Sequence, residues 1–307
     1  MKNKKTTVSI GIPAYNEEAN IQNAIRSVLN QKSDNFVLEK IIVISDGSSD
    51  NTVEKASSFK DKKIQIISGR TRIGKAERLN QIFNITNSEI LILLDADCIL
   101  EKDAIFEMIK IFNKDSRITL VGSNATPFEI SGFITKIVNI GVTINKRVGS
   151  QYHKGNNVYS YRGSLIGLTK KIYRSTKVPK DILADDAYLY MYTISKNLKK
   201  AWSKKIIVYY RIPSTISEHI KQSLRFVKSQ KAINKYFGDW TIKEFILPRK
   251  ILIKEIISLI FEQPIFAILF LVTNSYVSFL NLVDVKKMNY KWEMISSTKK
   301  ILYINEQ

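Results

Sequence analysis

The strongest constraint on the fold is a regular alternation of apolar runs and helical patterns along the first 125 residues. The apolar runs, rich in β-branched residues, are Val8–Ile12, Lys40–Ser45, Ile64–Ser68, Glu89–Leu94 and Ile118–Gly122. The helical patterns are Glu18–Asn30, Asn51–Phe59, Lys75–Asn84 and Lys102–Phe112. Strands that are apolar throughout are typical of a parallel sheet buried on both faces. The alternation therefore predicts an α/β fold with a mostly parallel central sheet.

Polar clusters follow three of these strands at their carboxyl ends. They are Pro13–Glu17 after the first strand, Asp46–Asp50 after the second and Asp95–Asp97 after the fourth. The carboxyl ends of parallel strands lie at one edge of the sheet, where open α/β sheets bind their ligands. Helix capping would explain one such cluster, but it does not explain three on the same edge. The sequence therefore predicts a ligand site there.

Asp95 and Asp97 form a candidate metal site at this edge. Residues i and i+2 of an extended chain point the same way, so the two carboxylates can converge on one cation. Hard oxygen ligands suit Mg²⁺ or Mn²⁺, either of which can hold a diphosphate. The chain has neither a G-x-G-x-x-G fingerprint after the first strand nor a P-loop pattern. We therefore expect a carboxylate-bound metal to hold the phosphates of the ligand.

The chain is strongly basic, with 48 Lys and Arg against 28 Asp and Glu and a net charge of +20. Such an excess favours an anionic partner: nucleic acid, a phosphate-rich ligand or a membrane surface. No recognisable nucleic-acid module is present, so we expect no nucleic-acid partner. The single cysteine, Cys98, suits a reducing compartment, and the apolar stretch Val8–Ala14 is too short for a signal peptide. We expect the catalytic part to be cytoplasmic.

The last third of the chain carries two membrane signals. Residues 264–283 have no charge and are just long enough for a membrane helix, although Asn274 and Ser278 interrupt them. Residues 217–236 predict a helix with a cationic stripe beside an apolar one, a pattern that lies flat on anionic lipid. For 264–283, a spanning helix, a monotopic or re-entrant helix pair and a helix packed in a soluble core all remain open. We expect the protein at the cytoplasmic face of the cell membrane, with the membrane surface as a partner.

Five motifs resemble those of family-2 glycosyltransferases, which have the nucleotide-sugar-binding A-type (GT-A) fold. They are Ile12–Glu18, Ser45–Thr52, Gly74–Asn80, Leu93–Cys98 and Ala184–Leu189, in the order of the family. The resemblance implies a Rossmann-like nucleotide-diphospho-sugar transferase domain over 1–215, with a donor half (1–125) and an acceptor half (126–215). Amphipathic and hydrophobic interfacial helices would follow over 216–307.

The resemblance also implies the reaction. It is inverting, metal-dependent transfer of a sugar from a nucleotide-diphospho-sugar, UDP-sugars being favoured over GDP-sugars, to a lipid-linked or membrane-held glycan. The donor-site residues it implies are Pro13, Tyr15, Glu17, Asp46, Lys75 and Asp95, with Asp95 and Asp97 as the Mg²⁺ or Mn²⁺ ligands. This chain departs from the family at Ser45, where an acid is usual, and at Arg78, where a small residue is common.

The pair Asp185-Asp186 matches the catalytic motif of the family, with Asp186 as the base. A base must take the proton of the acceptor hydroxyl, and a carboxylate whose pKa is raised by a like-charged neighbour suits that role. Acidic residues at a helix start also serve as simple caps, which is the alternative interpretation.

Two acceptor-side elements resemble the membrane-associated branch of the family, which includes cellulose, hyaluronan and glucosylceramide synthases. They are Tyr161, Arg162, Gly163 and Ser164, and then Gln222, Arg225 and Phe226, which resemble a Q-x-x-R-W motif with Phe in place of Trp. On a helix Gln222, Arg225 and Phe226 share one face. An ordinary basic amphipathic helix is the alternative interpretation of this segment.

Other functions are weaker hypotheses. A soluble glycan or a protein is the alternative acceptor. A sugar nucleotidyltransferase usually opens with a Gly-rich basic loop after its first strand, and this chain has Pro13–Glu17 there. A nucleic-acid-binding protein is suggested only by the charge.

Overall fold

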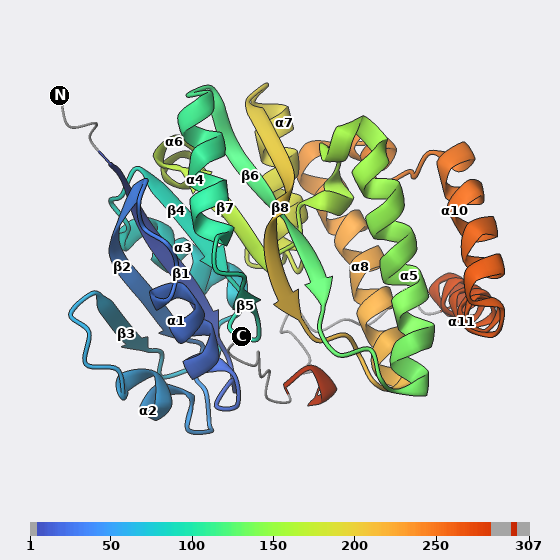
Figure 1. The fold of residues 1–307 in the computed structure, drawn as a ribbon, viewed down its shortest axis with the longest axis horizontal. Coiled ribbons are helices and arrows are strands. Elements are labelled where there is room, and N and C mark those ends of the chain that lie inside the picture. The colour runs from blue at the N-terminus through green and yellow to red at the C-terminus, as the bar shows by residue number, and fades with distance from the viewer. Residues whose placement is uncertain (1–4, 284–295, 300–307) are drawn as a thin grey trace.

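The computed structural model describes residues 5–283 and 296–299, and in this part of the chain an eight-stranded sheet forms the centre of the molecule (Figure 1). The strands are β1 (Thr6–Ala14), β2 (Phe36–Ser45), β3 (Ile64–Ser68), β4 (Ile90–Leu94), β5 (Ile99–Leu100), β6 (Ile118–Pro127), β7 (Leu165–Thr169) and β8 (Lys199–Tyr210). The α-helices are α1 (Ile21–Leu29), α2 (Thr52–Ser57), α3 (Lys75–Ile85), α4 (Ala104–Lys114), α5 (Phe133–Gln151), α6 (Lys170–Ser175), α7 (Asp185–Ser195), α8 (Ile216–Phe237), α9 (Trp240–Glu244), α10 (Arg249–Glu262) and α11 (Pro264–Val283). The short 3₁₀ segments are η1 (Tyr152–Gly155), η2 (Val158–Ser160) and η3 (Ser296–Lys299).

The strand order is β3-β2-β1-β4-β7-β6-β8-β5. Strands β3, β2, β1 and β4 are parallel, and β6 is parallel to β8. Strand β7 lies antiparallel between β4 and β6, and β5 is antiparallel to β8. The mostly parallel α/β sheet predicted from the sequence is therefore confirmed. The five predicted strands correspond to β1, β2, β3, β4 and β6, whereas β5, β7 and β8 were not predicted.

Helices cover both faces of the sheet. On one face α1 packs against β5, α2 against β2 and β3, and α4 against β6 and β8, and Ile10, Ile25 and Ile105 are fully buried in this layer. Helices α1 and α4 lie in front of the sheet in Figure 1. On the other face α3, α6 and α7 pack around Leu79 and Leu189. Each such fully buried aliphatic side chain stabilises the fold by roughly 1.5–3 kcal/mol. The strands therefore carry apolar residues on both sides, as the uninterrupted apolar runs predicted.

The C-terminal helices form a separate apolar cluster with α5. Leu259 of α10 and Phe270 of α11 are buried against this helix, while α8 packs against α7. Gly141 of α5 permits the contact, because a Cβ there would lie 2.4 Å from the Phe270 ring. The predicted helices 217–236 and 264–283 correspond to α8 and α11. Helix α11 buries only one side, since Ile265 and Val272 are 65% and 63% exposed.

Within residues 5–283 and 296–299, no helix combines the length and the apolar character that crossing a membrane requires. How the segment 264–283 lies relative to a membrane stays a prediction. The basic residues Lys286, Lys287 and Lys291, which flank this segment in the sequence, lie outside the described residues.

Candidate active site

One cavity of about 550 Å³ lies at the carboxyl ends of β1, β2 and β4, and every site residue predicted from the sequence lines it. From the donor half these residues are Pro13, Tyr15, Glu17, Asp46, Lys75, Asp95 and Asp97. From the acceptor half and α8 they are Tyr161, Arg162, Gly163, Ser164, Asp185, Asp186, Gln222, Arg225 and Phe226. Segments that are far apart in the sequence thus meet at the edge where open α/β sheets bind ligands.

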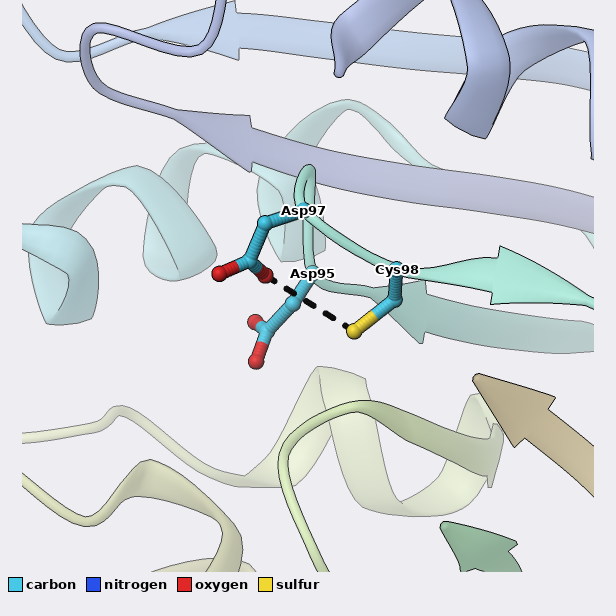
Figure 2. Close-up of side chains that lie close together, drawn as sticks. All are labelled: Asp95, Asp97 and Cys98. Carbon is cyan, nitrogen blue, oxygen red and sulfur yellow. Dashed lines mark hydrogen bonds between the residues drawn. The ribbon is translucent and has the colours of Figure 1, made fainter. Parts of the chain in front are cut away.

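The candidate metal site is the turn between β4 and β5. Figure 2 shows Asp95, Asp97 and Cys98 extending to the same side of this turn, and their ligand atoms lie within 4.8 Å of one another. Burial, helped by the charge of Asp95, raises the pKa of Asp97 to about 6. Burial also raises the pKa of the Cys98 thiol well above its ordinary value, so the group is a neutral thiol near pH 7. The donor set therefore consists of two carboxylates, which fit Mg²⁺ or Mn²⁺.

Lys75, the first residue of α3, joins this turn to the start of α7. Its Nζ lies 2.7 Å from Oδ1 of Asp95 and 3.1 Å from Oδ1 of Asp185. Burial by itself would lower the pKa of Lys75, but the charges of Asp185 and Asp95 outweigh it and raise that pKa. The side chain is therefore a permanent cation between two carboxylates.

Asp186 is held by two backbone N–H groups at the start of α7. The N–H of Gly163 donates to its Oδ2 at 2.8 Å, and the N–H of Ala187 donates to its Oδ1 at 2.7 Å. Burial is the largest cause that raises the pKa of Asp186 to about 6, and the charge of Asp185 adds to it. The raised pKa agrees in direction with the sequence argument, although burial outweighs the like-charged neighbour.

Asp46 faces the loop before α3 rather than open space. Its Oδ1 accepts hydrogen bonds from Ile73 N at 2.8 Å and from Arg78 Nε at 2.9 Å, and its Oδ2 accepts one from Gly74 N at 3.0 Å. The two side chains of the Asp46–Arg78 ion pair are only 7% and 6% exposed. Arg78, where the family often has a small residue, thus ties Asp46 to this loop, and Asp46 supports the wall of the cavity.

The other end of the donor half contains an ion pair that the sequence analysis did not foresee. The Nζ of Lys299, in η3, contacts the carboxylate of Glu17 and donates to the carbonyl of Tyr15 at 3.3 Å. The ring of Tyr15 also lies 4.0 Å below the guanidinium of Arg72. Glu17 is almost completely buried. No sequence pattern connects Lys299 with Glu17, because 282 positions separate them.

Helix α8 supplies the roof of the cavity near the carboxylates. Burial lowers the pKa of Arg225, and the charges of Asp186, Asp95, Asp185 and Asp97 act against that change, so the guanidinium lies close to all four. Phe226 is 39% exposed, and its ring packs 6.1 Å from that of Tyr159. Tyr161 is 1% exposed and donates to Asn156, so its ring belongs to the core beneath the cavity wall.

Several lining residues were missed by sequence reasoning, among them Arg211, His219, Phe270 and Asn274. They come from the end of β8, from α8 and from α11. His219 is 9% exposed, burial lowers its pKa, and its Nε2 has no hydrogen-bond partner in the described part of the chain. Lone polar residues of this kind carry no spacing signal, so only the fold brings them to the site.

Comparisons with known proteins agree with this geometry. Residues 9–176, more than half of the chain, match the family model described as Glycosyl transferase family 2. The poly-beta-1,6-N-acetyl-D-glucosamine synthase of Staphylococcus epidermidis is 33% identical over 134 residues, which are 43% of this chain and 32% of that protein. The similar segment thus spans about a third of that relative's length.

Solved structures with a similar fold cover more of the chain. Mannosyltransferase PcManGT from Pyrobaculum calidifontis, in complex with GDP-Man and Mn²⁺, aligns with a TM-score of 0.59 at 15% identity over 90% of this chain and 81% of its own. S. aureus TarS 1–349 in complex with UDP gives a TM-score of 0.54 at 14% identity over 74% and 64%. Glucosyl-3-phosphoglycerate synthase from Mycobacterium tuberculosis, with Mn²⁺ and UDP, gives 0.52 at 16% identity over 76% and 80%.

At these identities the likeness to the solved structures concerns the fold, which is that of the GT-A glycosyltransferases. The matched family segment runs from β1 to the end of β7 and α6, and it contains the loop before α3 and the Asp95–Asp97 turn. The family model matches more than half of the chain, and the fold agrees with it: the chain belongs to glycosyl transferase family 2.

Proposed function

We propose that the protein is an inverting, metal-dependent glycosyltransferase that moves a sugar from a nucleotide-diphospho-sugar to an acceptor hydroxyl. The observation that carries this proposal is the position of Lys75, whose Nζ contacts Asp95 of the candidate metal pair and Asp185, the neighbour of Asp186. The two candidate metal-binding carboxylates and the candidate base thus face the same cavity. An inverting transfer needs these two elements and no covalent intermediate on the enzyme.

In the proposed reaction Asp186 accepts the proton of the acceptor hydroxyl while that oxygen forms a bond to C1 of the donor sugar. The bond from C1 to the diphosphate oxygen breaks, and the diphosphate leaves with the electron pair. Arg225 lies close to the four carboxylates and would stabilise the charge that develops on the diphosphate. Asp95 and Asp97 would hold Mg²⁺ or Mn²⁺, which adds positive charge next to the same diphosphate.

The proposed donor is a nucleotide-sugar, with UDP-sugars favoured over GDP-sugars. The similar TarS and glucosyl-3-phosphoglycerate synthase structures contain UDP, whereas the mannosyltransferase contains GDP-Man. Tyr15, Glu17 and Arg72 line the end of the cavity next to β1, where a nucleoside would lie in this proposal. Asp46 would act there indirectly, through the loop that it holds.

The proposed acceptor is a lipid-linked or membrane-held glycan. Support comes from a surface of α10 and α11 on which large apolar side chains are exposed: Ile253, Ile257, Phe261, Ile265, Ile268, Val272, Tyr276 and Phe279. Phe261 is the most exposed of them, at 84%. Arg249, Lys250 and Lys254 are exposed on the same helix α10. An apolar face beside cations matches the interfacial region of anionic lipid.

A binding experiment tests the donor and the metal. We expect UDP-sugars, in the presence of Mn²⁺ or Mg²⁺, to raise the unfolding temperature of the full chain, and a chelator to remove this effect. Product analysis by NMR should show an inverted anomeric centre. Pyrophosphate release from a nucleoside triphosphate, without sugar transfer, would instead favour a sugar nucleotidyltransferase.

Vesicle flotation tests the membrane. We expect the full chain to float with vesicles that contain an anionic lipid, and Phe261→Glu to weaken this binding because it places a charge on the apolar face. Ile85→Glu, on the half-exposed end of α3, is the matched control. If wild type ignores anionic vesicles at low salt, a soluble glycan or a protein becomes the better acceptor hypothesis.

A further inference from the structure

Arg162 lines the cavity, and Lys146 of α5 follows the lining residue Asn145. In the described part of the chain, both side chains donate only to neutral hydroxyl groups. Arg162 Nη1 donates to the hydroxyl of Tyr210 at 2.9 Å, and Lys146 Nζ donates to the hydroxyl of Thr126 at 3.0 Å. Across residues 5–283 and 296–299, the structure gives neither cation a carboxylate within ion-pair distance. Three cations that line the cavity do have a carboxylate partner. Lys75 contacts Asp95 and Asp185, Arg78 contacts Asp46, and Lys299 contacts Glu17.

Arg162 and Lys146 also act on one another. Burial lowers the pKa of Lys146, and the positive charge of Arg162 lowers it further. Two partly buried like charges cost free energy unless an anion compensates them. Arg211 lies next to Tyr210 in the chain, lines the same cavity, and pairs with Glu129, whose carboxylate side chain is 56% exposed. Arg162 in the loop before β7 and Arg211 after β8, with Lys146 of α5 near them, therefore form a positively charged wall of the cavity.

Two further observations indicate a ligand in the cavity that this wall borders. His219 lines the cavity from α8, is nine-tenths buried, and leaves its Nε2 without a hydrogen-bond partner in the described chain. Buried polar atoms are normally satisfied, so such an atom on a cavity wall is available to a bound molecule. Arg162 also directly precedes Gly163, whose N–H binds Asp186. A group bound by Arg162 would thus lie close to the candidate base.

We propose that this wall is an anion subsite for the acceptor, in which Arg162 binds a phosphate ester and the nearby charge of Lys146 adds to the attraction, while Asp186 deprotonates a hydroxyl of the same molecule. This inference rests on the proposed function and names the class of acceptor. Arg162 supplies a planar guanidinium suited to two phosphate oxygens, and Lys146 supplies a point charge. The phosphate ester can belong to a soluble phosphorylated glycan or to a lipid-linked one.

The test uses the full chain saturated with UDP and Mg²⁺, so that the donor site is filled. We expect sn-glycerol 3-phosphate to bind this complex in calorimetry and glycerol not to bind. Arg162→Gln should weaken the binding at least tenfold, and Lys146→Gln should weaken it by a smaller factor. Lys114→Gln, on the exposed surface of α4, removes one charge elsewhere and should change nothing. Unchanged UDP affinity in Arg162→Gln shows that this variant is folded.

Three results would overturn the inference: equal binding of glycerol, unchanged binding in both Arg162→Gln and Lys146→Gln, or absence of binding once UDP is present. If glycerol 3-phosphate does not bind once UDP is present, Arg162 and Lys146 interact with the donor diphosphate instead. Failure of UDP itself to bind contradicts the proposed function instead, and glycerol 3-phosphate is then titrated into the nucleotide-free protein with the same variants.

A second arm identifies the source of the phosphate. Dihexanoyl phosphatidic acid, below its micelle concentration, carries the same ester on two short acyl chains. Phe270 and Val277 of α11 line the cavity and offer apolar contacts to such chains. Tighter binding than that of glycerol 3-phosphate indicates a lipid-linked acceptor, and equal binding indicates a soluble one. Binding of both ligands must be weakened in Arg162→Gln; if it is not, they bind at another site.

Discussion

Lys75 and Asp185 form an ion pair of 3.1 Å that links the start of α3 to the start of α7. The same Nζ lies 2.7 Å from Asp95, so one cation contacts both carboxylate clusters of the cavity. Its charge is among the causes that lower the pKa of Asp186, opposing burial and Asp185. Lys75 therefore links the candidate metal pair electrostatically to the candidate base.

A pH profile tests this link. Asp186 must be ionised to accept a proton, and burial raises its pKa to about 6, so kcat should fall as the pH drops below about 6. Lys75→Gln removes a positive charge that favours the ionised form. The acidic limb of the profile should therefore move to higher pH in this variant. If the midpoint of the acidic limb is the same in Lys75→Gln and wild type, a group other than Asp186 determines the fall of kcat at low pH.

The role of Asp186 is tested by Asp186→Asn. We expect kcat to fall by roughly 10²–10⁴, the range for loss of a general base. Nucleotide binding should be almost unchanged, because this carboxylate is held by the backbone N–H groups of Gly163 and Ala187, which lie outside the donor half. Asp185→Asn is the comparison, since Asp185 pairs with Lys75 and its charge raises the pKa of Asp186. A larger loss of kcat in Asp185→Asn than in Asp186→Asn would reverse the assignment.

The metal site is tested by Asp97→Asn. This nearly isosteric change should abolish sugar transfer and the metal-dependent rise in unfolding temperature. In the presence of chelator the variant should unfold at a higher temperature than wild type near neutral pH. Burial raises the pKa of Asp97 from 3.8 to about 6, so its ionisation destabilises the folded chain as the pH rises through that window. The exposed Asp34→Asn is the control, and metal-dependent stabilisation that survives in Asp97→Asn would contradict the assignment.

The Asp46–Arg78 pair predicts a stability effect. Arg78→Gln leaves the Asp46 carboxylate buried without its cation, and breaking such a pair costs about 3–5 kcal/mol. Nucleotide affinity should also fall, because Asp46 holds Ile73 and Gly74 in the loop that leads to Lys75. Urea denaturation measures the first effect. Arg70→Gln, exposed on the same loop, should change the free energy of unfolding by less than about 0.5 kcal/mol.

The first half of the sheet could be predicted from sequence because each strand is a local apolar run. Strand β7 could not, since its place depends on long-range pairing such as that of Leu91 with Leu168. The same distinction holds in the site. Asp95 and Asp97 were found because their spacing is local, whereas the charge of Arg162 acts on Lys146 only because of the way α5 packs beside the sheet. The spacing of residues in the sequence identifies a motif. Which other residues contact that motif depends on long-range packing, which spacing does not reveal.

The Glu17–Lys299 pair gives the last prediction, which concerns the position of η3 on the donor end of the cavity. Glu17→Gln and Lys299→Gln should each lower the free energy of unfolding, by about 1–3 kcal/mol, less than for a fully buried pair because the Lys299 side chain is 24% exposed. The double variant should cost less than the sum, since neither partner is then left as an unpaired charge. Urea denaturation of the three variants gives the coupling energy, with Lys114→Gln as the control. Strictly additive costs would show that Ser296–Lys299 does not pack against Glu17 in solution.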